Sequence, residues 1–277
     1  MPEGPEIQRA ADRLRRAIVD TPLRAVEFAS PALERYAPTL ASSRVGAIET
    51  RGKALLTHFD CGLSVYSHNQ LYGVWRIAKP GVLPQTTRSL RFAVHGERRS
   101  ILLYSASDIA VLDAAGIALH PFLARLGPDV LDPRLDEAAV LLQLQAPRFA
   151  RRRLTGLLLD QGFFAGIGNY LRSEIAFVAG IDPRRRPSEL SLPERLKLAA
   201  AILTVCRQAY RFRGVTNDLA RAAALKSAGW SYEARRFHVF DRDGQPCHVC
   251  GTTIERHDDG RRWYLCPCCQ QTSPNRG

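Results

Sequence analysis

Cysteine spacing at the end of this 277-residue chain predicts a metal site. Five of its seven cysteines lie between Cys247 and Cys269. Cys247 and Cys250 form a C-x2-C pair, and Cys266 and Cys269 form a second pair after a spacer of 15 residues. Two residues between cysteines let both thiolates of a tight turn bind one ion, and two such pairs complete a tetrahedral four-sulfur site. We expect one structural Zn²⁺ ion, because four thiolates leave no position open for a substrate.

Cys268 competes with Cys269 for the fourth ligand position, and the two-residue spacing favours Cys269. His248 and His257 are further candidates, but a ligand directly beside another in a tight turn has poor geometry. Unpaired structural cysteines and a redox dithiol are the alternative readings. Neither cysteine pair lies in a βαβ pattern, which disfavours a redox role.

The N-terminus is a second candidate for chemistry. Pro2 follows the initiator methionine and is small enough to permit its removal, which would expose a secondary amine. A terminal amine has a pKa of about 8, well below the roughly 10.4 of lysine, so more of it is nucleophilic at neutral pH. Glu3 offers a carboxylate for proton transfer, and a helix starting at Pro5 disfavours the ammonium form. The alternative is an ordinary helix N-cap.

Two basic residues lie at turns next to predicted strands. Gly52 allows a sharp approach that would place Lys53 at the start of a strand. Arg261 follows Asp259-Gly260, a pair typical of hairpin turns, so we expect it at an exposed tip. Either residue, considered alone, is as well explained as a solvated surface side chain.

Two loops have the composition of nucleic-acid contacts. Gln70, Leu71 and Tyr72 form a polar-aromatic tip between strand-like runs, which either packs back or inserts into a partner. The segment 157–170 contains three glycines, and Asn169 is placed to cap the following helix. Backbone amides at such a helix start bind phosphate. Four arginines lie just upstream: Arg148, Arg151, Arg152 and Arg153.

The composition limits the classes of protein to consider. Lysine and arginine number 39 against 27 aspartates and glutamates, a net charge of +12. The chain lacks a run of the roughly 18 to 20 apolar residues that a membrane helix needs, and its first residues lack the apolar core of a secretion signal. We expect a soluble intracellular protein with a polyanionic partner, not a membrane protein, a secreted disulfide scaffold or a disordered chain.

Hydrophobic periodicity changes along the chain. Apolar spacing predicts a helix over 5–19, and short alternating runs over 23–112 predict a β-sandwich or barrel. The pattern becomes helical near 120–121, and a basic, polar stretch over 213–235 is read as a linker to the cysteine-bearing hairpin. The expected helices of the middle region span 136–145, 153–161, 170–178 and 192–212.

Together these segments resemble the formamidopyrimidine-glycosylase and endonuclease VIII family of bifunctional DNA glycosylases, closest to the endonuclease VIII branch. Gly4 and the Gln70-Leu71-Tyr72 tip favour that branch over the purine-specific one. The segments that carry the resemblance span nearly the whole chain: MPEGPEI, RGKALLTHF, YSHNQLYGVW, LLYSASDI, HPFLARLGPDVLDP, LLLDQGFFAGIGNYLRSEI and the cysteine-bearing hairpin.

The resemblance implies an α+β multidomain fold. An N-terminal helix and a catalytic β-sandwich would occupy 1–120, and a helical helix-two-turns-helix domain would occupy 121–235. A zinc-finger β-hairpin over 236–272 and a tail over 273–277 would complete the chain.

The resemblance also implies roles for individual residues. Pro2 would attack C1′ of the damaged nucleotide, and Glu3 would supply a proton to the departing base. Lys53 would assist acid–base chemistry and β-elimination, and Arg261 would bind phosphate and assist δ-elimination. Five residues would contact DNA, with Leu71 and Tyr72 filling the gap left by the extruded base: Gln70, Leu71, Tyr72, Arg125 and Asn169.

The implied function is excision of oxidised pyrimidines from damaged double-stranded DNA through a Pro2 Schiff base, followed by β,δ-elimination. It requires no diffusible cofactor and no membrane, and the resemblance implies a monomer in the bacterial cytoplasm. The alternatives are the same chemistry on oxidised purines, such as formamidopyrimidine and 8-oxoguanine, and a non-catalytic zinc-finger DNA-binding protein.

Overall fold

The computed structural model describes residues 2–271 and divides the chain into two compact units, Met1–Arg125 and Leu126–Gly277. The predicted tail over 273–277 lies outside the described residues. No helix within the described part of the chain is long and apolar enough to cross a membrane.

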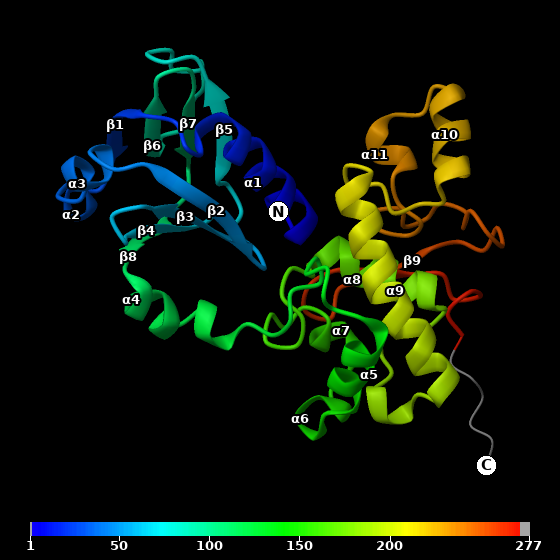
Figure 1. Ribbon diagram of the computed structural model, residues 1–277. Coiled ribbons are helices and arrows are strands. Elements are labelled where there is room, and N and C mark those ends of the chain that lie inside the picture. The colour runs from blue at the N-terminus through cyan, green and yellow to red at the C-terminus, as the bar shows by residue number, and fades with distance from the viewer. Residues whose placement is uncertain (1, 272–277) are drawn as a thin grey trace. The chain divides into compact units, whose positions relative to one another are not determined.

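The first unit contains two four-stranded antiparallel sheets, as the alternating runs predicted (Figure 1). One sheet has the strand order β1-β6-β7-β5 and the other has the order β2-β3-β4-β8. The strands are β1 (Leu23–Phe28), β2 (Val45–Arg51), β3 (Ala54–Phe59), β4 (Ser64–His68), β5 (Val74–Ala78), β6 (Leu90–Gly96), β7 (Ser100–Tyr104) and β8 (Asp108–Leu112).

Side chains from both sheets form one core. Phe92 and Val94 of one sheet and Leu55 and Val65 of the other belong to the same buried cluster. Alternate residues of each strand face this core because successive side chains point to opposite faces of a sheet. The unit is therefore a β-sandwich, the fold class expected from the sequence.

Helix α1 (Gly4–Ile18) completes this core. Its apolar side chains recur at helical spacing, and Ala11, Leu14 and Ile18 are fully buried in the sandwich cluster. Pro5 lies in the first turn, where its missing N–H is not needed. Burial of this face fixes the helix against β2 and β3, and so fixes the start of the chain.

The remaining elements of the first unit lie outside the two sheets. Helices α2 (Pro31–Glu34) and α3 (Ala37–Ala41) interrupt a segment that the sequence analysis read as strands only. Helix α4 (Ala114–Leu119) and the 3-10 turn η1 (Leu123–Arg125) follow β8. Ile117 of α4 and Phe122, which lies between α4 and η1, pack on the outer face of the second sheet, against Tyr66.

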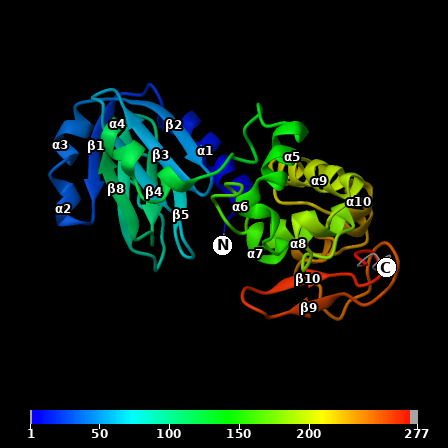
Figure 2. The same ribbon diagram turned by 90° about the horizontal axis from the view of Figure 1, so that it is seen from below.

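The second unit is a helical core to which a small hairpin is attached. Helices α8 and α9 pack together, and α5 packs on α9. The helical elements are α5 (Glu137–Gln145), α6 (Pro147–Ala150), α7 (Leu154–Leu157), α8 (Asn169–Ala179), η2 (Pro187–Glu189), α9 (Leu192–Arg211), α10 (Leu219–Ser227) and α11 (Tyr232–Arg235). The hairpin consists of β9 (Glu255–His257) and β10 (Trp263–Leu265), and β10 lies beside α8 (Figure 2).

Three expectations for the second unit were wrong. The helix expected over 153–161 ends at Leu157, because the following residues form the turns of a glycine-containing loop. Gly168, not Asn169, is the N-cap of α8, and Asn169 is its first helical residue. The stretch over 213–235 is not a bare linker, because Asp218 and Ser231 cap α10 and α11 within it.

A buried carboxylate ties the segment before the hairpin to α8. Glu174 is fully buried and accepts backbone N–H bonds from His238 at 2.8 Å and from Val239 and Phe240 at 2.9 Å. The hydroxyl of Thr216 donates to the same carboxylate. The three backbone N–H groups and the Glu174 carboxylate thus satisfy one another away from water, which makes this contact costly to break.

We expect Glu174→Gln to destabilise the second unit, because one neutral carbonyl oxygen cannot accept all four bonds. The predicted loss is about 1 to 3 kcal/mol of unfolding free energy, the usual cost of leaving buried donors unsatisfied. Urea denaturation of the whole chain measures it. Glu233→Gln, at an exposed ion pair, is the matched control; equal midpoints for both variants would contradict the assignment.

Candidate active site and metal centre

The predicted nucleophile and proton donor lie at the start of α1. Pro2 is half-buried, whereas Glu3 is only 2% exposed and is the N-cap of the helix. The Glu3 backbone N–H donates to the Glu6 carboxylate at 3.0 Å, one half of a capping box. The helix end therefore holds two acidic residues beside the residue whose nitrogen would become the terminal amine.

Lys53 lies in the same unit, in the tight turn between β2 and β3. It is 6% exposed, and Gly52 before it has a φ of +60°, a left-handed conformation that favours glycine. Ala54, the next residue, is paired with His68 at the end of β4. The register of the sheet therefore places the Lys53 turn beside the end of β4, from which the 70–72 tip emerges.

The tip itself is a tight turn that exposes apolar side chains. The Gly73 N–H donates to the Asn69 carbonyl at 2.7 Å, and a Cβ on Gly73 would lie 2.5 Å from that oxygen, so the turn requires glycine. Leu71 and Tyr72 are 58% and 67% exposed. Exposed neighbouring side chains of this size are costly to hydrate, which indicates a surface that inserts into a partner.

Ionisable groups gather behind this tip. Burial lowers the pKa of His68, the Asp108 carboxylate raises it, and the Lys53 ammonium lowers it. Burial also raises the pKa of Tyr66, whose hydroxyl donates to Asp108 at 3.2 Å. Neither His68 nor Asp108 was predicted as a site residue from the sequence. The structure brings them together as a direct cross-strand pair.

Arg125 ends the first unit. Its side chain is exposed, and its Nε donates to the Pro121 carbonyl at 2.7 Å. This bond fixes the root of the side chain while the guanidinium stays at the surface, where it can reach an anionic partner.

In the second unit, a glycine-containing loop leads into α8. The Gln161 amide organises it by donating to the Leu159 and Ile167 carbonyls and accepting from the Gly166 N–H. Gly168, the N-cap of α8, has no side chain with which to cap the first amides of the helix. A helix start of this kind presents N–H groups and a positive dipole end to an anion.

Arg172 joins two of the predicted site residues, and the sequence analysis missed it. It is 2% exposed, and its Nη2 donates to Asn169 Oδ1 at 2.8 Å, the Arg261 carbonyl at 2.8 Å and the Arg262 carbonyl at 2.7 Å. Its Nη1 donates to the Thr155 carbonyl at 2.7 Å. One guanidinium therefore holds α7, Asn169 and the hairpin tip together, while the Arg261 side chain is exposed.

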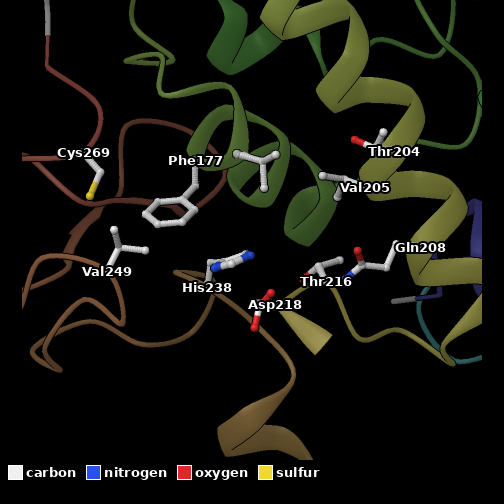
Figure 3. Close-up of a pocket in the computed structure, with 10 residues that line it drawn as sticks. Phe177, Thr204, Val205, Gln208, Thr216, Asp218, His238, Val249 and Cys269 are labelled. Atoms are coloured by element: carbon white, nitrogen blue, oxygen red, sulfur yellow. The ribbon is translucent and has the colours of Figure 1, made fainter. Parts of the chain in front are cut away.

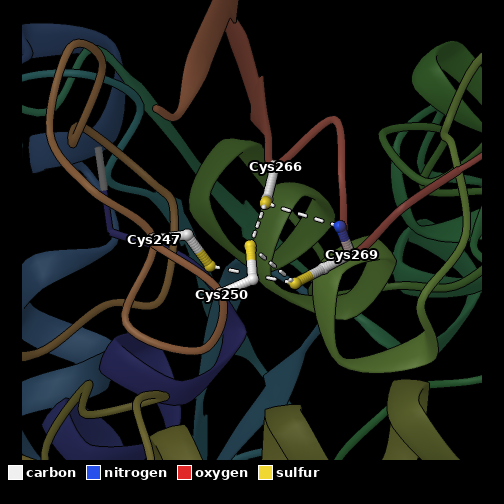
Figure 4. A group of neighbouring side chains, drawn as sticks. All are labelled: Cys247, Cys250, Cys266 and Cys269. Atoms are coloured by element: carbon white, nitrogen blue, oxygen red, sulfur yellow. Dashed lines mark hydrogen bonds between the residues drawn. The ribbon is translucent and has the colours of Figure 1, made fainter. Parts of the chain in front are cut away.

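The four cysteines selected by their spacing converge (Figure 4). Their Sγ atoms all lie within 4.8 Å of one another, and individual pairs are separated by 3.4, 3.5 and 3.9 Å. A tetrahedron with Zn–S bonds of about 2.3 Å has edges of about 3.8 Å, so the donor set fits such an ion. Cys268 lies outside the cluster and is exposed.

Three of these thiols have shifted pKa values, in opposite directions. Hydrogen bonding from Thr252 lowers the pKa of Cys250 to about 6, whereas burial raises the pKa of Cys266 and of Cys269. A divalent ion would offset the repulsion between four thiolates, and metal binding would release protons. The cluster could therefore hold a metal ion at the base of the hairpin.

A separate cavity of about 420 Å³ lies near this cluster (Figure 3). Phe177 of α8, Val205 of α9 and His238 line it together with Cys269. Among the described residues, its lining includes none of Pro2, Glu3, Lys53 or Arg261. It is consequently not the pocket of the predicted chemistry.

Comparison with known families agrees with this architecture. Residues 1–106 match the formamidopyrimidine-DNA glycosylase N-terminal domain, and residues 126–219 match the formamidopyrimidine-DNA glycosylase H2TH domain. The chain therefore belongs to the formamidopyrimidine-DNA glycosylase family, as the sequence motifs predicted.

Individual relatives refine the comparison. The chain is 50% identical over 271 residues to a protein named Endonuclease 8 from Klebsiella pneumoniae, covering 98% of this chain and all of the relative. A protein of the same name from Escherichia coli is 49% identical over the same length. A solved MutM bound to carbocyclic 8-oxo-G DNA superposes with a TM-score of 0.80 at 21% identity, covering 98% of this chain and 100% of that one, which shows a shared fold.

We expect the purified chain to contain one metal ion, and two cysteine variants to separate the ligands. Cys268→Ala should retain the ion, since its side chain lies outside the cluster, whereas Cys269→Ala should lose it. Metal content by mass spectrometry and release of zinc to a colorimetric chelator provide the measurement. Loss of metal from Cys268→Ala with retention in Cys269→Ala would reverse the assignment.

Arg172→Lys should weaken binding to DNA while leaving the metal content unchanged. A single ammonium cannot span the acceptors that Nη1 and Nη2 reach, so Asn169 and the hairpin tip lose their common support. Charge-assisted bonds contribute about 1.5 to 3 kcal/mol, which predicts at least a tenfold rise in Kd for a duplex with an abasic-site analogue. Fluorescence anisotropy measures it.

Arg207→Lys is the control, because its Nη2 bonds only the Leu135 carbonyl among the contacts described. If both variants bind DNA as the wild type does, Arg172 does not support the binding surface.

Proposed function

We propose that this protein is a DNA glycosylase and abasic-site lyase of base excision repair that removes oxidised pyrimidines from damaged duplex DNA. The observation that carries the proposal is that nearly the whole chain is about 50% identical to proteins named Endonuclease 8. The chain also contains Pro2, Glu3 and Lys53, the residues that the proposed chemistry needs. The net charge of +12 favours binding to a phosphate backbone.

Access to the lesion comes first. A base inside a duplex cannot be reached, so the damaged nucleotide must be flipped out at a cost of a few kcal/mol. Leu71 and Tyr72 are exposed and would fill the space left in the stack. Gln70, Arg125 and Asn169 would contact the DNA around the opened site, and the start of α8 would bind a phosphate.

Base removal would use the start of α1. The free amine of Pro2 forms a bond to C1′ of the nucleotide as the bond from C1′ to the base breaks, and Glu3 delivers the proton that the departing base needs. The attached nitrogen then loses its proton, and its lone pair forms an iminium (Schiff base) with C1′ as the C1′–O4′ bond of the sugar breaks and O4′ takes up a proton. Glu3 adjoins Pro2 in the chain and is buried, so water has little access to the carboxylate that makes this transfer.

Strand cleavage would follow from the same imine. The imine acidifies the C2′ hydrogen, whose removal expels the 3′ phosphate by β-elimination, with Lys53 assisting the proton transfers. A second proton loss expels the 5′ phosphate by δ-elimination, which Arg261 would assist by binding that phosphate. An arginine suits this last role because its planar guanidinium binds phosphate in a bidentate manner.

The cysteine cluster would hold one Zn²⁺ ion through Cys247, Cys250, Cys266 and Cys269. Four sulfur ligands leave no open position, so the ion would stabilise the hairpin and the Arg261 tip without taking part in the reaction. We place the protein as a monomer in the bacterial cytoplasm, as the bacterial relatives and the intracellular use of its cysteines suggest.

Two alternatives have specific support. The family name and the MutM structure favour oxidised purines, but Gly4 and the 70–72 tip favour the pyrimidine branch. A non-catalytic DNA-binding protein would need only the hairpin and helices. It would not require a free terminal amine at Pro2 together with Glu3 and Lys53, all of which the chain contains.

Borohydride trapping tests the proposal. Reduction of the imine should link the protein covalently to a duplex that carries thymine glycol, and trapping should be much weaker with 8-oxoguanine. Pro2→Gly should lower the yield at least tenfold, since it replaces the ring amine by a primary amine of different geometry. Denaturing electrophoresis of the labelled DNA measures the adduct.

Each other result changes the assignment. Preferential trapping with 8-oxoguanine would move the protein to the purine branch. Tight binding to both duplexes with no adduct on either would support the DNA-binding alternative, and an undiminished adduct with Pro2→Gly would exclude Pro2 as the nucleophile.

A further inference from the structure

We infer that His68 is a positioning residue that holds the 70–72 tip in the conformation that inserts into DNA, by accepting a hydrogen bond on Nδ1 from the Gln70 backbone N–H. This inference rests on the proposed function. It is carried by contacts within the first unit: the Gln70 nitrogen lies 3.0 Å from His68 Nδ1.

The tip needs such support because its backbone is strained. Gln70 has a φ of +48°, a left-handed conformation that costs a residue with a Cβ on the order of 1 kcal/mol. Two polar contacts hold it there. The backbone N–H donates to His68, and the side-chain Oε1 accepts from the Ser107 hydroxyl at 2.7 Å. Leu71 and Tyr72 directly follow this residue and are exposed.

This hydrogen bond also defines the tautomer of His68. Since Nδ1 accepts, the proton of the neutral ring lies on Nε2, and a protonated ring could not accept the bond at all. The ring is fixed by edge-on packing against Phe122, at 5.2 Å between centroids. It lies at the end of β4, so its pairing with β3 and β8 and the contact with Phe122 hold it independently of the tip.

The charges around His68 make the contact sensitive to pH. Asp108 lies directly opposite in the β4–β8 register, and Lys53 precedes the β3 residue that pairs with His68. Tyr66 on β4 donates to Asp108 and packs against His120. Burial and Lys53 lower the pKa of His68 and outweigh Asp108, so the ring is neutral at pH 7.

The direction of the pH effect follows from the lowered pKa of His68. A histidine whose pKa is lowered in the folded state stabilises it fully above the unfolded value of about 6.5 and loses this contribution as pH falls below that value. On protonation, Nδ1 becomes a donor that faces the Gln70 N–H, and Gln70 loses one of the two polar contacts described for it. Insertion into duplex DNA should weaken at acid pH, whereas chemistry at Pro2 should not change for this reason.

Two variants at one position test the inference. His68→Asn places its side-chain Oδ1 the same number of bonds from Cβ as Nδ1, so it keeps an acceptor but cannot titrate. His68→Leu removes the acceptor. His58→Leu, on the adjacent strand β3, is the structural control, because His58 bonds Ser64 and not the tip.

The measured quantity is the ratio of two rates for each protein. One is excision of thymine glycol from a duplex, which needs insertion of the tip, and the other is cleavage of an abasic site in a single strand, which needs only the chemistry. The ratio should fall on the order of tenfold for His68→Leu and change less than about threefold for His68→Asn and His58→Leu. Below pH 6.5, it should fall for the wild type but not for His68→Asn.

Either of two results would overturn the inference: an unchanged ratio in His68→Leu, or equal losses in His68→Asn and His68→Leu. Equal loss of both rates in His68→Leu would also overturn it, since His68 would then act in the chemistry or in folding. Failure of the proposed function is distinguishable, because the wild type itself would then cleave neither substrate, or only the abasic site if it acts on oxidised purines.

Discussion

Two buried charges on one helix set the geometry of the second unit. Arg172 and Glu174 of α8 are both at most 2% exposed, and each binds backbone groups from distant parts of the chain. Arg172 holds the hairpin tip, and Glu174 holds the segment that leads to the hairpin. A buried charge that loses its partners costs several kcal/mol, so neither contact loosens without the other groups moving. The four-cysteine cluster lies at the base of a hairpin whose position α8 already determines.

In the first unit, strand register sets the geometry of the site residues. Ala54 pairs with His68, and His68 pairs with Asp108. The neighbouring strands β3, β4 and β8 therefore bring Lys53, a neutral imidazole and a carboxylate to the same end of the sheet. A slip of one residue would turn every one of these side chains to the opposite face. The packed core between the two sheets prevents that slip, because it would expose Leu55 and Val65.

Much of this arrangement could be predicted from the sequence. The convergence of four cysteines could be predicted from spacing alone, because two residues between cysteines is a local constraint. The sandwich and most helices follow from periodicity. Arg172 could not be found in this way, since its partners Arg261 and Arg262 are carbonyls about ninety positions away. The cap of α8 was misplaced by one residue because Gly168 and Asn169 are both acceptable N-caps, and only the loop geometry selects between them.

The 70–72 segment combines an exposed apolar tip with a base that the paired strands hold in place. A surface that fills a gap in stacked bases must be apolar, yet it must not collapse onto the protein when DNA is absent. Gln70 has a left-handed conformation directly before the exposed Leu71 and Tyr72, and such strain persists only where the surrounding structure overdetermines it. On the proposed function, the cost of exposing the pair in the free protein would be offset by the stacking it replaces in the opened duplex. Affinity for damaged DNA would then depend on the groups that hold Gln70 as well as on Leu71 and Tyr72.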